Sequence, residues 1–185
     1  MEKFKVIETP IKDLVIIETK IFKDDRGFFI ESYNLRDFTS LGINVNFVQD
    51  NHSMSKKGIL RGLHFQLQHP QGKLVRVISG KVFDVAVDLR LKSPTFGKWY
   101  GIKLSYDNGL QFYIPPGFAH GFLTLEENTH FFYKCTDFYY PEDETGIIWN
   151  DPSIGIEWPT EKVEEVIISN KDKNLPKFEE VKEWL

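Results

Sequence analysis

Apolar and polar residues alternate with a period of two along most of this chain. The clearest run is residues 82–89, in which Phe83 and Val85 alternate with Asp84 and Ala86. Such alternation is typical of β-strands, because successive side chains of a strand point to opposite faces. Similar short runs occupy residues 14–22, 28–33, 46–52, 74–78, 102–105, 111–114, 121–125 and 129–139. The pattern therefore predicts many short strands.

Turn-forming residues separate these runs, as at Asp25-Arg26-Gly27, Ser93-Pro94 and Asp107-Asn108-Gly109. Many short strands at this spacing indicate an all-β sandwich or barrel. Residues 36–41 and 177–185 could each form a short helix.

The length of 185 residues suits one domain, and we expect residues 1–185 to form it. Within it, residues 1–50 should supply N-terminal strands at a dimer interface. The segment 160–185 mixes charges with isolated apolar residues, which predicts a tail packed on the outside. Hydrophobic residues make up 41% of the chain, which is ample for a core and argues against disorder.

Composition also limits the possible binding partners and the cellular compartment. The net charge of -4, without a basic run, argues against nucleic acid, whose binding depends on neutralising phosphates. No apolar run approaches the roughly 20 residues of a membrane span, and the N-terminus lacks the apolar stretch of a signal peptide. Cys135 is the only cysteine, so no intrachain disulfide can form. These features together predict a cytoplasmic protein that binds neither membranes nor nucleic acid.

Two glycine–histidine motifs point to one kind of β-barrel. The first spaces Gly58 and His64 as Gly-x5-His, and the second reads Gly109-x5-Pro115-x-Gly117-x2-His120. Together they resemble the signature of the cupin jelly roll, which holds its site inside the barrel. The expected fold is thus an all-β, cupin-type jelly roll with short peripheral helices.

The metal site of such a barrel is incomplete in this sequence. Metal-binding cupins normally read His-x-His with a carboxylate a few residues on, whereas Gln66 takes the second position here. No Asp or Glu occurs between Gln66 and Gly80. Zinc, iron and manganese prefer three or four imidazole, thiolate or carboxylate ligands, so we expect no metal. His64 is then available for acid–base chemistry.

On a strand, Gly62, His64 and Gln66 share one face. Strict alternation puts Arg61 on the opposite face, so the two could line one pocket only if the backbone bends, for which Gly62 is the suitable place. His120 would be a second imidazole facing His64 across the lumen. A packed or exposed histidine, or a turn residue, is the structural alternative for these positions.

Three further residues have chemistry that a barrel lumen could use. Tyr133 could act as a general acid if the site lowered its pKa from about 10, although an aromatic core strand would hold it equally well. Lys73 could neutralise an enolate oxygen, or could be an ordinary surface lysine. An inward-pointing Asp84 would need a partner.

Eight segments of the chain, taken together, closely resemble the dTDP-4-dehydrorhamnose 3,5-epimerase family. They begin at Asp25, Phe47, Leu60, Gln71, Ser93, Ile114, Tyr133 and Ser169, and read DRGFFIES, FVQDNHS, LRGLHFQ, QGKLVR, SPTFG, IPPGFAHGF, YK and SNKD. The match runs in order over about residues 13–172. The resemblance implies a dimeric, metal-free jelly roll that needs no cofactor.

The resemblance also implies a role for each matching residue. His64 would be the general base, Asp172 would orient it and stabilise its charge, Tyr133 would be the general acid, and Lys73 would lie near the ketone oxygen. The residues expected to bind the nucleotide sugar are Arg26, Glu31, Gln49, Asp50, Asn51, Arg61, Lys73, His120, Glu144 and Lys171. The N-terminal members of this set could come from a partner subunit.

The implied substrate is a dTDP-4-keto-6-deoxy sugar, inverted at C3 and C5. Hydrogens next to a carbonyl are acidified, so a base on one face and an acid on the other suffice for inversion. A single-carbon epimerase or a ketoisomerase acting on the same nucleotide sugar is the nearest alternative. A metal-dependent cupin enzyme and a non-catalytic sugar-binding cupin are the alternatives from other classes.

Overall fold

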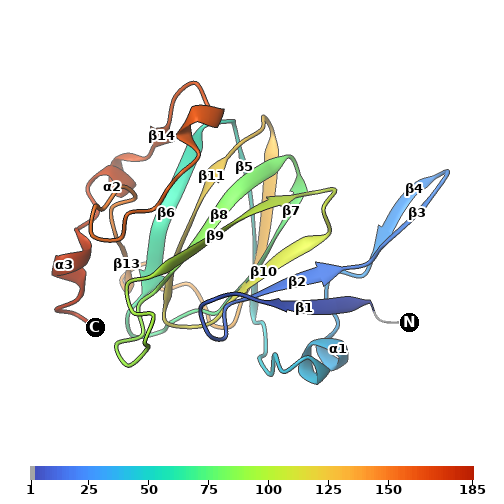
Figure 1. Ribbon diagram of the computed structural model, residues 1–185, viewed down its shortest axis with the longest axis horizontal. Coiled ribbons are helices and arrows are strands. Elements are labelled where there is room, and N and C mark those ends of the chain that lie inside the picture. The colour runs from blue at the N-terminus through green and yellow to red at the C-terminus, as the bar shows by residue number, and fades with distance from the viewer. Residues whose placement is uncertain (1–2) are drawn as a thin grey trace.

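The structure is a computed structural model that describes residues 3–185, and its main body is formed by two facing β-sheets (Figure 1). The first sheet has the strand order β1 (Phe4–Glu8), β2 (Val15–Thr19), β10 (Leu110–Ile114), β7 (Lys73–Ser79), β12 (Thr129–Cys135) and β5 (Gln49–Ser55). The second has the order β13 (Glu144–Gly146), β6 (Ile59–Gln66), β11 (Phe118–Thr124), β8 (Lys81–Asp88) and β9 (Trp99–Ser105). A short strand, β14 (Ile167–Ile168), runs parallel to β6, whereas the other pairings are antiparallel. This arrangement confirms the predicted all-β jelly roll.

Apolar side chains from the inner faces of both sheets fill the space between them. Val75, Leu104 and Phe112 are fully buried, and Phe131 is nearly so. These residues come from runs whose period-two alternation the sequence shows. The core occupies one part of the sandwich and leaves the other part to polar side chains.

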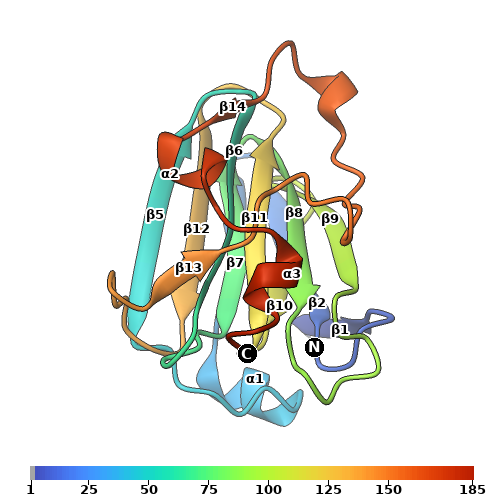
Figure 2. The ribbon, with the colours of Figure 1, turned by 90° about the vertical axis from the view of Figure 1, so that its left-hand side faces the viewer.

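Two segments outside the sheets cover their outer faces. Helix α1 (Leu35–Ser40) buries Phe38 against the first sheet, and Asn34 caps it by accepting from the amides of the first turn. The C-terminal segment crosses the second sheet and buries Trp158 and Phe178 there (Figure 2). It contains the 3-10 turn Thr160–Lys162 and the short helices α2 (Asn170–Lys173) and α3 (Phe178–Val181).

The predicted run 14–22 is two strands, because the chain leaves the first sheet at Lys20. It continues as β3 (Ile21–Asp24), which pairs with β4 (Gly27–Ile30) in a hairpin that projects from the sandwich (Figure 1). Phe29 on this hairpin is 66% exposed. The predicted helix over 177–185 is likewise shorter, since only four residues of it are helical. Within residues 3–185, no helix has the length and apolar character needed to cross a membrane.

Candidate active site

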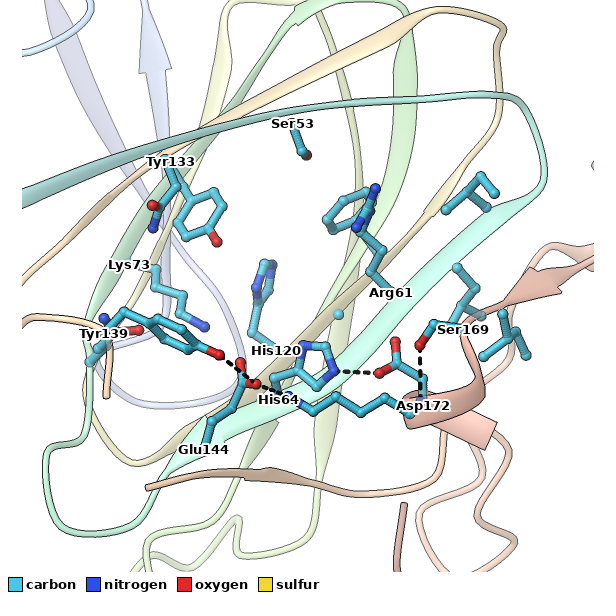
Figure 3. Close-up of a pocket in the computed structure, with 18 of the residues that line it drawn as sticks. Ser53, Arg61, His64, Lys73, His120, Tyr133, Tyr139, Glu144, Ser169 and Asp172 are labelled. Atoms are coloured by element: carbon cyan, nitrogen blue, oxygen red, sulfur yellow. Dashed lines mark hydrogen bonds and ion pairs between the residues drawn. The ribbon is translucent and has the colours of Figure 1, made fainter. Parts of the chain in front are cut away.

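A cavity of about 640 Å³ opens between the two sheets, on the side of the sandwich next to β5 and β6 (Figure 3). It contains most of the residues that the sequence predicted for the site. These are Gln49, Asn51, Arg61, His64, Lys73, His120, Tyr133, Glu144, Lys171 and Asp172. The cavity therefore gathers side chains from six strands and from the C-terminal segment.

A bulge in β6 explains how Arg61 and His64 reach the same cavity. His64 pairs with His120 and Arg61 pairs with Phe122. The two pairs are therefore three positions apart on β6 but only two positions apart on β11, so β6 contains one extra residue. Gly62 lies inside this bulge with φ of +112°, which an L side chain rarely adopts. The extra residue reverses the alternation and turns Arg61 to the side of His64. The structure thus places the bend at the glycine where the sequence required it.

His64 forms a hydrogen-bonded dyad with Asp172 from α2. Its Nε2 lies 2.8 Å from Asp172 Oδ1, and the Gly62 amide donates to Asp172 Oδ2 at 3.1 Å. Burial opposes ionisation of Asp172, but the hydrogen bond and charge of His64 and the Gly62 amide together lower its pKa. The Asp172 amide donates to Ser169 Oγ, which caps α2 and fixes the carboxylate (Figure 3). Because Nε2 is engaged, Nδ1 is the nitrogen of His64 left for a ligand.

Tyr133 and Lys73 come from the first sheet and face His64 across the cavity (Figure 3). Lys73 Nζ lies 5.9 Å from the centroid of the Tyr133 ring. Burial, with Cys135 and Glu144 nearby, raises the pKa of Tyr133 to about 12. The pKa of Tyr133 is therefore raised and not lowered, contrary to the expectation for a general acid near neutral pH, and the phenol stays protonated. Burial lowers the pKa of Lys73, against the attraction of Cys135 and Glu144.

His120 lies beside His64 rather than across the lumen. The prediction was wrong because β6 and β11 are adjacent strands of the same sheet, where His120 and His64 are register partners. His120 Nε2 lies 3.0 Å from Asp84 Oδ2, which supplies the partner that this inward carboxylate needed. Asp88, on the same strand, instead accepts hydrogen bonds from Arg90 outside the cavity.

Three predicted binding residues lie outside the cavity of their own chain. Asp50 is on the opposite face of β5 from Gln49 and Asn51, as strand alternation requires, and it pairs with Lys134 at 2.9 Å. Glu31 pairs with Lys3 at 2.8 Å, near α1. Arg26 is at the tip of the β3–β4 hairpin, where its side chain is 90% exposed.

The cavity also contains polar residues that the sequence reasoning missed. Ser53 continues the alternation of Gln49 and Asn51 along β5, so the period of two could have identified it. Tyr139 lies beyond the end of β12, and its hydroxyl donates to Glu144 Oε2 at 3.1 Å. Glu144 also forms an ion pair with Lys171 (Figure 3). No sequence period indicates the position of Tyr139, because a loop carries it there.

Gln66, which takes the second ligand position of the cupin motif, holds that loop in place. Its Oε1 accepts from the Tyr140 amide at 2.8 Å, and its Nε2 donates to the His69 carbonyl at 2.7 Å. Across residues 3–185, no three His, Cys, Asp or Glu side chains are grouped so that they could hold a metal ion.

A sequence model described as dTDP-4-dehydrorhamnose 3,5-epimerase matches residues 8–180. The chain belongs to this family. The dTDP-4-dehydrorhamnose 3,5-epimerase of Methanothermobacter thermautotrophicus is 54% identical over 174 residues, which cover 94% of each chain. That of Salmonella typhimurium is 57% identical over 173 residues, covering 92% of this chain and 93% of the relative.

Solved structures of the epimerase family have the same fold. The crystal structure of the Legionella pneumophila epimerase in complex with dTDP-4-keto-L-rhamnose superposes with a TM-score of 0.94 at 51% identity, covering 98% of this chain and 97% of that one. A 3'-monoepimerase from Streptomyces bikiniensis also superposes, with a TM-score of 0.87 at 28% identity, covering 95% of this chain and 88% of that one.

Proposed function

We propose that this protein epimerises dTDP-4-dehydro-6-deoxy-D-glucose at C3 and C5, giving dTDP-4-dehydro-β-L-rhamnose. The observation that carries the proposal is the placement of the His64–Asp172 dyad and the Tyr133 phenol on opposite walls of one cavity. Inversion next to a ketone requires a base on one face of the sugar and a proton donor on the other. The reaction as written consumes no oxidant, reductant or metal.

Each catalytic side chain has a distinct part in the proposed reaction. His64 Nδ1 removes the proton at C3 or C5, and the ionised Asp172 stabilises the imidazolium that forms. The protonated Tyr133 then delivers a proton to the opposite face of the enolate. Lys73 lies on the same wall as Tyr133, where an ammonium stabilises negative charge on the former carbonyl oxygen.

The remaining cavity residues would line the site around the rest of the nucleotide sugar. Arg61 presents a guanidinium held at 3.2 Å to Ser55 Oγ, and guanidinium groups suit the oxygens of a diphosphate. Gln49, Asn51, His120, Glu144 and Lys171 complete the set within one chain. Asp50 points away from the cavity, so we assign it no direct contact.

Arg26 and Glu31 lie outside the cavity of their own chain, and a second copy of the chain could bring them to it. We therefore include a homodimer in the proposal, in which the β3–β4 hairpin of one subunit reaches the cavity of the other. The exposed aromatic side chains of the hairpin, such as Phe28 and Phe29, support an interface there. A cytoplasmic location is part of the same proposal, because the lone Cys135 is a free thiol.

Incubation with the 4-keto nucleotide sugar in D2O tests the proposed function. NMR should locate deuterium at both C3 and C5, whereas a single-carbon epimerase would label and invert only one of them. His64→Ala should lower both exchange and inversion by at least about 10²-fold, the usual size of general-base effects.

His69→Ala is the matched control. His69 forms a similar pair with Asp143 at 3.1 Å, but it lies outside the cavity. This variant should exchange deuterium at the wild-type rate. Wild-type protein that binds the sugar without any exchange would instead identify a sugar-binding cupin without activity.

A further inference from the structure

Asp84 is a fully buried carboxylate that the proposed roles do not use. It comes from β8, and its Oδ1 and Oδ2 lie 3.1 Å and 3.0 Å from His120 Nε2. No other hydrogen bond to this carboxylate occurs among residues 3–185. A buried charge with one partner is costly, because few donors replace the water it has lost. The pair must therefore either be neutral as a unit or be maintained for a function.

The two His–Asp pairs of the cavity have opposite electrostatic settings. Asp172 receives the Gly62 amide as well as His64, and its pKa is lowered. Burial raises the pKa of Asp84 despite the attraction of His120, and burial lowers the pKa of His120 despite Asp84. Both directions favour a net-neutral Asp84–His120 pair with one proton shared between the carboxylate and Nε2. In such a pair, the other ring proton must be on Nδ1.

Nδ1 of His120 is in contact with the cavity. It takes part in no hydrogen bond among residues 3–185. Because none of these residues has a fully buried side-chain nitrogen or oxygen without a partner, Nδ1 must be accessible. His120 lines the cavity, and its ring is stacked at 20° to that of Phe131, with centroids 6.0 Å apart. The contacts with Asp84 and Phe131 thus fix the ring and leave Nδ1 as the atom for a ligand.

The position of His120 beside His64 suits one part of the reaction. The two are register partners on adjacent strands, whose side chains lie about 5 Å apart at Cβ. The hydrogen that a base removes and the carbonyl oxygen are on neighbouring carbons of the sugar. A donor next to the base therefore meets the oxygen on which negative charge develops.

On the basis of the proposed function, we propose that His120 donates its Nδ1–H to the carbonyl oxygen of the sugar while His64 removes the neighbouring proton. Asp84 would be a positioning residue that keeps the pair protonated and orients the ring. The C–H proton moves to His64, the electron pair forms the enolate, and the proton on Nδ1 stays in place as a hydrogen-bond donor. Reprotonation of the carbon reverses the charge flow without another reactant.

Nitrogen-15 NMR of histidine-labelled wild-type protein tests the state of the ring directly. The chain has five histidines, and the spectrum of His120→Gln would assign the His120 signals by difference. We expect Nδ1 of His120 to carry a proton at neutral pH. An unprotonated Nδ1 throughout the active pH range would overturn the inference, and this readout does not depend on which sugar the protein epimerises.

The activity test compares Asp84→Asn with Asp88→Asn. Both aspartates are fully buried on β8, but Asp88 interacts with Arg90 outside the cavity. Asp84→Asn should lower kcat for exchange at least about tenfold, with a smaller change in KM, because a charge-assisted donor is roughly twice as strong as a neutral one. Asp88→Asn should lower stability and leave kcat unchanged.

The pH profile separates this role from a structural one. In wild-type protein, loss of the shared proton at high pH removes the donor from Nδ1, so kcat falls. In Asp84→Asn this alkaline limb should vanish, because the pair no longer titrates. The other titratable groups that face His120 in the cavity are Lys73 on β7, His64 on β6 and Tyr133 on β12. If the alkaline limb persists unchanged in Asp84→Asn, it belongs to one of these groups and the inference is overturned.

If Asp84→Asn fails to fold, the NMR measurement on wild-type protein still decides the question. If wild-type protein shows no exchange with any 4-keto nucleotide sugar, the proposed function fails. A protonated Nδ1 together with normal exchange in Asp84→Asn would reject the catalytic role and leave the proposed function standing.

Discussion

At the scale of single residues, the surroundings of the proposed base, His64, differ from those of the proposed acid, Tyr133. The partner of His64 is an ionised carboxylate with several donors, which favours a positive charge on the ring after proton abstraction. Tyr133 is buried on the opposite wall near Cys135 and Glu144, which favours its neutral form. One wall is thus prepared to take a proton and the other to give one.

Tyr133→Phe should separate proton exchange from inversion. His64 can still remove a proton and return it to the same face, so deuterium exchange should persist while inversion falls by at least about 10²-fold. Both would be measured by NMR in D2O. Tyr113→Phe, which also removes a buried hydroxyl but lies outside this cavity, should behave as wild type. Inversion at the normal rate in Tyr133→Phe would show that another group is the acid.

The pKa of Tyr133 also has a consequence for the pH profile. Because the pKa is raised to about 12, the phenol remains protonated throughout the neutral and moderately alkaline range. Its ionisation therefore contributes no loss of inversion below roughly pH 11, one unit under that pKa.

At the scale of elements, period-two alternation located most strands but could not show how they pair. It missed β1, although Phe4, Val6 and their charged neighbours alternate, and it missed β13 and β14, which are too short to have a period. These short strands matter, because β13 brings Glu144 to the cavity and β14 leads into α2.

The candidate site was predictable only in part for the same reason. Lys73 and Tyr133 lie on long strands, and Gly62 marked the possible bend. Asp172 is 108 residues from its partner His64, so no local pattern joins them, and only the family resemblance indicated the pair. Tyr139 reaches the cavity on a loop that Gln66 holds, which is a tertiary effect.

Gly62→Ala should damage both stability and activity. A Cβ at this position would lie 2.6 Å from Gly121 Cα and from the His120 carbonyl oxygen, and φ is +112°. The expected loss exceeds about 2 kcal/mol in the free energy of unfolding, since backbone strain alone costs about 1–3 kcal/mol. Urea denaturation measures the stability, and exchange in D2O measures the activity.

Gly42→Ala separates the two causes of that loss. Gly42 also has a positive φ, +88°, but nothing lies within 4 Å of the added Cβ. Gly42→Ala should lose only the strain, with normal exchange. Equal losses of stability and activity in both variants would mean that the close approach of β6 and β11 at Gly62 has no special effect.

At the scale of the whole molecule, some of the residues predicted to bind the substrate do not reach the cavity of their own chain. The β3–β4 hairpin projects away from the body and places Arg26 in solvent (Figure 1). The exposed Phe28 and Phe29 lie on the same hairpin. A hairpin that crosses to a second subunit would bury these rings and bring Arg26 to a diphosphate, and this arrangement makes a prediction about mixed dimers.

Arg26→Ala and His64→Ala subunits should complement each other when they are mixed. Arg26→Ala alone should weaken dTDP binding about tenfold, the value of one charge-assisted contact, and His64→Ala alone should be inactive. In a mixed dimer with crossed hairpins, the cavity that retains His64 receives Arg26 from the other subunit. At substrate concentrations too low to saturate Arg26→Ala, co-refolded mixtures should therefore exchange deuterium faster than the sum of the separate variants. If the hairpin served its own subunit, every cavity in the mixture would lack one of the two residues. An absence of gain, or an active monomer in light scattering, would thus contradict the shared site.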